Sequence, residues 1–201
     1  VAAEIPPTPL YQRGARGDFY SVRLIRRPLG GLPSFDLLVS PDGAPGVWQA
    51  LVESGATPMG VEAMDAVRVR YGVPYYGREM GEAFNPLEAG LIGSIDFAKG
   101  CYIGQEVIAR LDTYHKVQRA LVTLRFAPDA QVVEGMNLRR GEQRVGVVTS
   151  LARIPKTGEV IGLGYVRTEA AAVGARLELE EVPGGWAEVE ELPELFGPGK
   201  G

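Results

Sequence analysis

The stretch Lys99-Gly100-Cys101-Tyr102-Ile103-Gly104-Gln105-Glu106 decides how the fold of the whole chain is interpreted. It holds the single cysteine of the 201 residues. Apolar residues recur at helical spacing at Ile103, Val107 and Leu111, which predicts a short helix that begins after the cysteine. A strand over residues 93–97 and a glycine turn at Lys99–Gly100 are expected before it. The sequence therefore predicts a strand, a tight turn, the cysteine and a helix in succession.

Two interpretations of Cys101 follow from these residues. The amide dipoles at a helix N-terminus favour a thiolate, and the charge of Lys99 would add to that effect. The small residue Gly104 near the helix start would let backbone amides approach a ligand. Against this, a free cysteine often packs as a small hydrophobic residue. The spacing alone leaves a reactive and an inert thiol equally open.

Composition excludes several classes of protein. The formal net charge of −4 gives no general affinity for nucleic acid. No apolar run is long enough to span a membrane, and no secretion signal opens the chain, so a reducing cytoplasm is the expected setting. One cysteine and the single histidine, His115, cannot build a structural zinc site, and we expect no metal.

The pattern along the chain predicts two domains of an α+β protein. Residues 1–116 read as a mixed α/β lobe, with strands over 19–26 and 34–40 that pair as a hairpin and helices over 45–54 and 60–71. In the second strand Phe35, Leu37 and Val39 alternate as one apolar side, and the first helix is expected to turn Val47, Trp48, Leu51 and Val52 inward. Residues 117–193 read as a small antiparallel β-barrel, and residues 194–201 as a tail. The barrel strands are expected at 121–126, 144–150, 160–167, 176–182 and 186–190.

The octapeptide 99–106 resembles the signature of the YgfZ family, folate-binding proteins related to the glycine cleavage T-protein (aminomethyltransferase). The segment 85–91 resembles the P-x-E-A-G-L sequence of both families, and 116–121 resembles the connector into their C-terminal barrel. T-proteins carry aspartate and phenylalanine where this chain has Cys101 and Tyr102. The cysteine therefore indicates the YgfZ branch. The resemblance also implies that residues 1–116 are the C-terminal part of the folate-binding domain, with about half of that domain upstream of Val1.

A second segment resembles the T-protein family with two departures. The strand 34–37 and the residues Gly60, Ala63, Asp65 and Arg68 match the family pattern. In T-proteins a turn before this strand supplies a glutamate that holds the pterin ring, whereas the turn at 30–33 here has no carboxylate. Arg70 stands where the family has glutamate.

The resemblance implies roles for individual residues. Cys101 would be the chemically active group with Lys99 beside it, at a pocket between the lobe and the barrel. Arg68, Tyr71 and Glu88 would contact folate. The motif residues Gly100, Tyr102, Gly104, Gln105 and Glu106 would shape the loop or hold a ligand.

For each residue assigned to folate, its sequence context also suits a role that involves no ligand. Arg68 also suits a surface ion pair with Asp65 or Glu62. Tyrosines such as Tyr71 more often pack in a core with a hydrogen-bonded hydroxyl. Glu88 equally suits a capping or structural role at a helix start.

Three functions are expected from this reading. The first is a YgfZ-type protein that binds tetrahydrofolate and acts in iron–sulfur cluster assembly or maintenance, including for tRNA-modifying enzymes. Its partners would be a folate derivative and iron–sulfur enzymes or assembly proteins. The second is a folate-dependent aminomethyltransferase of T-protein type. The third is a non-enzymatic interaction module with a degenerate ligand site.

Overall fold

The structure is a computed structural model. It describes residues 11–13, 19–26, 29, 32–97, 99–102, 104–106, 108, 117–154 and 156–190. The predicted tail at 194–201 lies outside these residues, as do residue 116 of the predicted connector and Ile103, Val107 and Leu111, on which the helix after Cys101 is predicted. No helix in the described part of the chain is long and apolar enough to cross a membrane.

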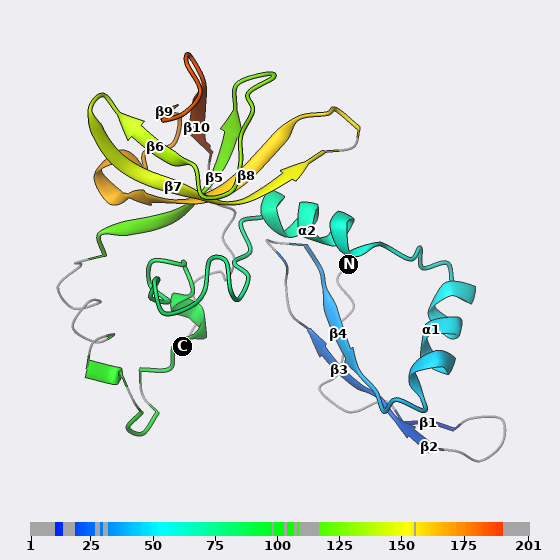
Figure 1. Cartoon of the computed structure of the whole chain (residues 1–201). Helices are drawn as coiled ribbons and strands as arrows, with labels where there is room; N and C mark the ends of the chain where they lie inside the picture. The colour runs from blue at the N-terminus through cyan, green and yellow to red at the C-terminus, as the bar shows by residue number, and fades with distance from the viewer. Residues whose placement is uncertain are drawn as a thin grey trace.

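The C-terminal part is a closed antiparallel β-barrel, as predicted (Figure 1). Its strands follow the order β10-β5-β8-β7-β6-β9 around the barrel. Their bounds are β5 Arg119–Phe126, β6 Asn137–Arg140, β7 Gln143–Arg153, β8 Val160–Arg167, β9 Arg176–Leu179 and β10 Trp186–Glu190, with a short 3-10 helix η2 at Thr168–Ala170 after β8. The sequence pattern missed β6, because its four residues end in two arginines and lack a clear apolar alternation.

The barrel encloses a hydrophobic core of its own. Side chains that alternate along the strands point inward and are almost completely buried, among them Leu124, Leu138, Val148, Val166, Leu177 and Val189. This burial removes apolar surface from water and stabilises the closed sheet.

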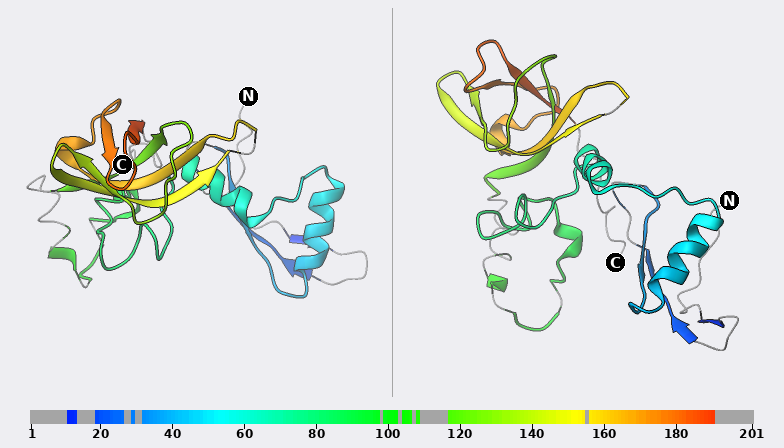
Figure 2. Two further views of the ribbon diagram at one scale, coloured as in Figure 1. Left: turned by 45° about the horizontal axis from the view of Figure 1, so that its top comes forward. Right: turned by 45° about the vertical axis from the view of Figure 1, so that its right-hand side comes forward.

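The described N-terminal part consists of two two-stranded sheets, two α-helices and a 3-10 helix (Figure 2). Strands β1 (Tyr11–Arg13) and β2 (Phe19–Ser21) pair with each other, as do β3 (Arg23–Arg26) and β4 (Phe35–Leu38). Helices α1 (Ala44–Glu53) and α2 (Val61–Arg70) follow, and a 3-10 helix η1 occupies Ile92–Ser94. Both predicted helices are confirmed. The strand predicted over 19–26 is interrupted at Val22, and only its second part, β3, forms the predicted hairpin with β4.

Two predictions for this part were wrong. Residues 93–97 form no strand, because the 3-10 turn of η1 occupies their start. Most of the apolar side chains expected to point inward from β4 and α1 are more than one third exposed: Phe35 and Leu37 on the strand, and Trp48, Leu51 and Val52 on the helix. Helix α1 buries no residue.

A second hydrophobic cluster joins α2 to the barrel. Val69 of α2 and Ala89 pack with Leu121, Ile161, Leu163 and Tyr165 of the barrel strands. Helix α2 accordingly lies against β7 and β8. This junction is the only place where the described residues preceding η1 contribute buried apolar side chains to a core.

Glycines let neighbouring barrel strands approach closely. Adding a methyl group at one of these glycines should therefore destabilise the barrel. A Cβ atom on Gly164 of β8 would lie 2.7 Å from the Val147 carbonyl oxygen and 2.8 Å from Leu124 Cδ1. We expect Gly164→Ala to lower the free energy of unfolding by about 1–3 kcal/mol, measured by urea denaturation. The control Gly81→Ala adds its methyl group in open space and should change stability by less than about 0.5 kcal/mol. Equal effects of the two substitutions would contradict this account of the barrel.

Candidate functional site

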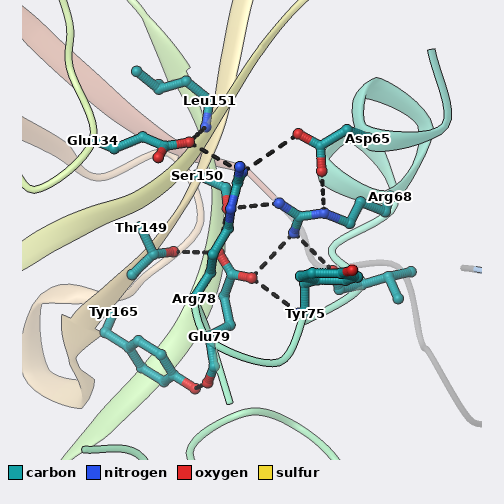
Figure 3. A network of polar contacts seen from close by, with 11 residues as sticks. Asp65, Arg68, Tyr75, Arg78, Glu79, Glu134, Thr149, Ser150, Leu151 and Tyr165 are labelled. Carbon is teal, nitrogen blue, oxygen red and sulfur yellow. Dashed lines mark hydrogen bonds and ion pairs between the residues drawn. The ribbon is translucent and has the colours of Figure 1, made fainter. Parts of the chain in front are cut away.

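Arg68, the predicted folate contact in the last turn of α2, lies at the centre of a buried polar network (Figure 3). Its guanidinium donates to the Asp65 carboxylate at 2.5 Å, to the Glu79 carboxylate at 3.1 Å and to Ser150 Oγ at 2.7 Å. It also donates to the Val73 carbonyl oxygen at 3.3 Å. Arg68 therefore links its own helix, the loop that follows it and barrel strand β7.

Glu79 is the acidic centre of this network and is fully buried. One carboxylate oxygen accepts hydrogen bonds from Ser150 Oγ at 2.5 Å and from Thr149 Oγ1 at 2.7 Å. The other oxygen accepts from Arg68 and from the Tyr75 backbone amide at 3.0 Å. A buried carboxylate is tolerated where a cation and several donors replace its lost water, and each of these is present here.

A β-bulge in β7 makes this arrangement possible. Neighbouring side chains of a regular strand point to opposite faces, yet Thr149 and Ser150 reach the same oxygen of Glu79. The register of β7 with β8 shifts between Val148 and Ser150, at these two residues. A bulge bends the strand and re-aims side chains locally, so it supplies the pair of hydroxyl donors.

Arg78 forms the solvent-exposed rim of the network. It contacts Glu134 at 3.1 Å, the second oxygen of Asp65 at 3.4 Å and Ser150 Oγ at 3.5 Å. Exposed ion pairs of this kind contribute about 0–1 kcal/mol, so the buried contacts of Arg68 and Glu79 dominate.

A second buried carboxylate, Glu88, is held by Arg119 of β5. The guanidinium donates to both carboxylate oxygens, at 3.0 and 3.1 Å. Glu88 and Asn85 also exchange backbone-to-side-chain hydrogen bonds in the manner of a capping box. These contacts fix the turn over residues 85–90 against the first barrel strand, where the Glu88 carbonyl accepts from the Leu121 amide.

Tyr165 connects the two carboxylate clusters. Its ring stacks on Phe84 with centroids 3.8 Å apart, and its hydroxyl donates to the Glu79 carbonyl oxygen at 2.7 Å. Burial, together with the negative charges of Glu88 and Glu79, raises the pKa of the Tyr165 phenol above its ordinary value. Tyr165 therefore stays protonated at neutral pH and serves as a hydrogen-bond donor.

Two of the three predicted folate contacts, Arg68 and Glu88, are thus engaged within the protein. Arg68 pairs with Asp65 as one alternative anticipated, but its guanidinium is buried and also pairs with the buried Glu79, so a surface ion pair is the wrong description. Both oxygens of Glu88 receive donors from Arg119, which agrees with the structural alternative. Tyr71 lies half-buried just after α2. The Arg68 guanidinium and the Glu88 carboxylate are held by other groups of the protein, and their contact with folate stays a prediction.

The cysteine loop lies apart from this network. Cys101 is exposed, and Figures 1 and 2 show its segment extending away from both α2 and the barrel. The expectation that the thiol lies at a pocket between the lobe and the barrel stays a prediction. Lys99 places its ammonium 4.6 Å from the centre of the Tyr102 ring.

The remaining motif residues follow Cys101 into a helical turn. Gln105 is half-buried, Glu106 is exposed, and both are helical. Gly104 takes the left-handed backbone conformation, with φ of 89°, while Gly100 does not. The backbone freedom that we expected to matter at Gly100 is therefore used at Gly104.

Comparison with known proteins identifies the family. The sequence model described as "GCVT N-terminal domain" matches residues 13–99, and that of the "Glycine cleavage T-protein C-terminal barrel domain" matches residues 119–196. The fold and these consecutive matches define a two-part protein of the T-protein class. The chain belongs to the glycine cleavage T-protein family.

Individual relatives and a solved structure agree with this. A putative chloroplastic transferase of Arabidopsis thaliana is 38% identical over 165 residues, which cover 82% of this chain and 38% of that protein. An aminomethyltransferase of Thermosynechococcus vestitus is 33% identical over 166 residues, covering 83% and 45%. The crystal structure of the glycine cleavage system aminomethyltransferase T from Bartonella henselae shares the fold, with a TM-score of 0.67, 23% identity and coverage of 87% and 49%. The chain thus spans less than half the length of each of these proteins.

Sequence reasoning missed Glu79, Thr149 and Ser150. Glu79 has an ordinary surface-like context in the sequence, between Arg78 and Met80. Ser150 was read as the end of a barrel strand, and nothing in a period-two pattern signals the bulge that turns it towards Glu79.

The network predicts that Glu79 matters more to stability than an exposed carboxylate. Glu79→Gln keeps the shape but removes the charge that faces the buried Arg68. We expect the free energy of unfolding, measured by urea denaturation, to fall by about 3 kcal/mol. In the control Glu169→Gln, the lost partner is Arg167 in an exposed pair at 3.9 Å, and the change should stay below about 0.5 kcal/mol. Comparable losses in both variants would rule out a special role for Glu79.

Proposed function

We propose that this chain is the folate-contacting and barrel portion of an aminomethyltransferase-type protein, which passes a one-carbon unit to tetrahydrofolate. The observation that carries the proposal is the kinship along 13–99 and 119–196 with aminomethyltransferases, in the same order as in those proteins. Cytoplasmic localisation is part of this proposal.

Within the chain, the buried network would act as a support for the folate site. Arg68, Glu79 and Ser150 fix the end of α2 against β7. This fixes the position of Tyr71, whose half-buried ring follows directly on α2. An aromatic ring held in this way can stack on a pterin without further ordering of the side chain.

The proposal predicts saturable binding of tetrahydrofolate by the chain, with a contribution from Tyr71. Stacking on an aromatic ring contributes about 0.5–1.5 kcal/mol, so Tyr71→Ala should raise the Kd by roughly two- to tenfold. Isothermal titration calorimetry measures this. The matched control is Tyr76→Ala, because Tyr76 is a strongly exposed tyrosine in the following loop, and this variant should bind like wild type. A flat titration of the wild-type chain would contradict the proposal.

A second candidate, a YgfZ-type role in iron–sulfur cluster assembly or maintenance, is favoured by one observation. Cys101, the residue that distinguishes the octapeptide from T-proteins, is exposed and free. An exposed thiol suits transient chemistry with a partner protein, such as an iron–sulfur enzyme or an assembly protein. The resemblance includes tRNA-modifying enzymes among those partners.

This candidate predicts that Cys101→Ser abolishes function in cells that lack the native protein while leaving its fold intact. The exposed side chain makes a large loss of stability unexpected, so the denaturation midpoint should match wild type. A thiol reagent should also label the native chain once, because Cys101 is its single cysteine. Full complementation by Cys101→Ser would eliminate this candidate and leave the aminomethyltransferase proposal unaffected.

A further inference from the structure

We propose that α2 is held to the barrel by a second, ionic attachment on the outer surface of the barrel, and that this attachment loosens as ionic strength rises. The inference is independent of the proposed activity. The attachment is the last link in a chain of alternating charges that runs from strand β9 to helix α2. We call this chain the ion-pair row, and it comprises Arg176, Glu188, Arg125, Glu190 and Arg70.

The pairing of the barrel strands places four members of the row on the outer face of the barrel. Each of the four has a neighbour along its strand that is buried in the barrel core, and successive side chains of a strand point to opposite faces. Glu188 of β10 lies directly opposite Arg125 of β5 and Arg176 of β9. Opposite charges at directly paired positions of neighbouring strands stabilise a sheet. The strand register therefore builds the row across β9, β10 and β5.

The barrel side of the row is well ordered. Glu188 accepts a hydrogen bond from Arg176 at 2.8 Å on one carboxylate oxygen and from Arg125 at 2.7 Å on the other. These two hydrogen bonds, that of Arg176 first, lower the pKa of the Glu188 carboxyl, so it is charged at neutral pH. The guanidinium carbons of Arg176 and Arg125 also lie 4.3 and 5.5 Å from the centre of the Trp186 ring. Both arginines are thus held by a carboxylate and an aromatic ring before Arg70 joins the row.

Arg70, in the last turn of α2, completes the row. Its guanidinium lies 3.7 Å from one carboxylate oxygen of Glu190, and the other oxygen of Glu190 lies 3.6 Å from Arg125. Helix α2 packs on β7 and β8, whereas Glu190 belongs to β10, which is separated from β8 by β5 in the barrel. The ion pair therefore attaches α2 to a part of the barrel that the buried network around Arg68 does not reach.

The two attachments of α2 differ in their exposure to solvent. The side chains of Arg68 and Glu79 are almost completely buried, whereas that of Arg70 is 52% exposed and that of Glu190 is 34% exposed. Dissolved ions screen exposed charges strongly and buried pairs much less. Added salt should therefore weaken the Arg70 attachment and leave the buried network intact.

The test measures hydrogen exchange at the backbone amides of Tyr71 and Gly72, whose hydrogen bonds close the last turn of α2. In the wild-type chain we expect exchange at these two amides to become about two- to fivefold faster between about 0.01 M and about 1 M NaCl, as the Debye length falls from about 30 Å to about 3 Å. Amides of the barrel core, such as that of Leu124, should keep their exchange rates.

Two variants and a matched control assign the effect to the ion pair. Arg70→Gln and Glu190→Gln should each make the same two amides exchange about two- to fivefold faster at low salt and should remove the salt dependence. The double variant should exchange no faster than either single variant, because both substitutions remove the same contact. The control is Arg167→Gln, since Arg167 is also 52% exposed and its partner Glu169 lies 3.9 Å away. This control should exchange like wild type at the end of α2.

Unchanged barrel exchange in the same experiment shows that each variant remains folded. Exchange at Tyr71 and Gly72 that does not respond to salt in the wild-type chain would overturn the proposal. An effect of Arg70→Gln that Glu190→Gln does not share would also overturn it, because Arg70 would then act through the dipole of α2 and not through the barrel. Folate binding is not a readout here, so this test and that of the proposed function can fail separately.

Discussion

A buried ion pair between Arg68 and Glu79 sets the geometry on which the rest of the described structure depends. Two charges removed from water lose solvation that their mutual attraction alone does not restore. Here the deficit is offset by the hydroxyls of Thr149 and Ser150, the Tyr75 amide and the Asp65 carboxylate. These partners come from α2, the loop after it and β7. The charges can therefore be satisfied only when the helix and the barrel meet in one orientation.

The two parts of the molecule on either side of this junction differ in how completely they are packed. On one side the barrel closes around its own core and supplies the bulged strand that receives Glu79. On the other side α2 is anchored by Val69 and Arg68, while the hairpin and α1 beyond it have no buried apolar contacts among the described residues. The family matches divide the chain at the same place, since the N-terminal-domain model matches residues 13–99 and the barrel model matches residues 119–196, which include every described barrel strand.

Local sequence patterns predicted the positions of helices and strands well, but they predicted poorly which side chains of these elements are buried. Period-two alternation located most barrel strands, and turn residues located the β3–β4 hairpin, because both signals act over a few residues. Burial of Phe35 and Trp48 was predicted wrongly. An apolar pattern identifies which side of a strand or helix is hydrophobic, but it does not show whether another element packs on that side. Arg68 was recognised as important from its motif. Its partner Glu79 was not, because the contact with Ser150 spans 71 residues and depends on a bulge.

The central claim is that Arg68 and Glu79 are energetically coupled across the junction, and a double-mutant cycle tests it most directly. The free energies of unfolding of wild type, Arg68→Met, Glu79→Met and the double variant give the coupling energy. The account predicts that the double variant is more stable than the sum of the single losses implies, with a coupling of roughly 2–3 kcal/mol. Additive losses, with a coupling below about 0.5 kcal/mol, would contradict it.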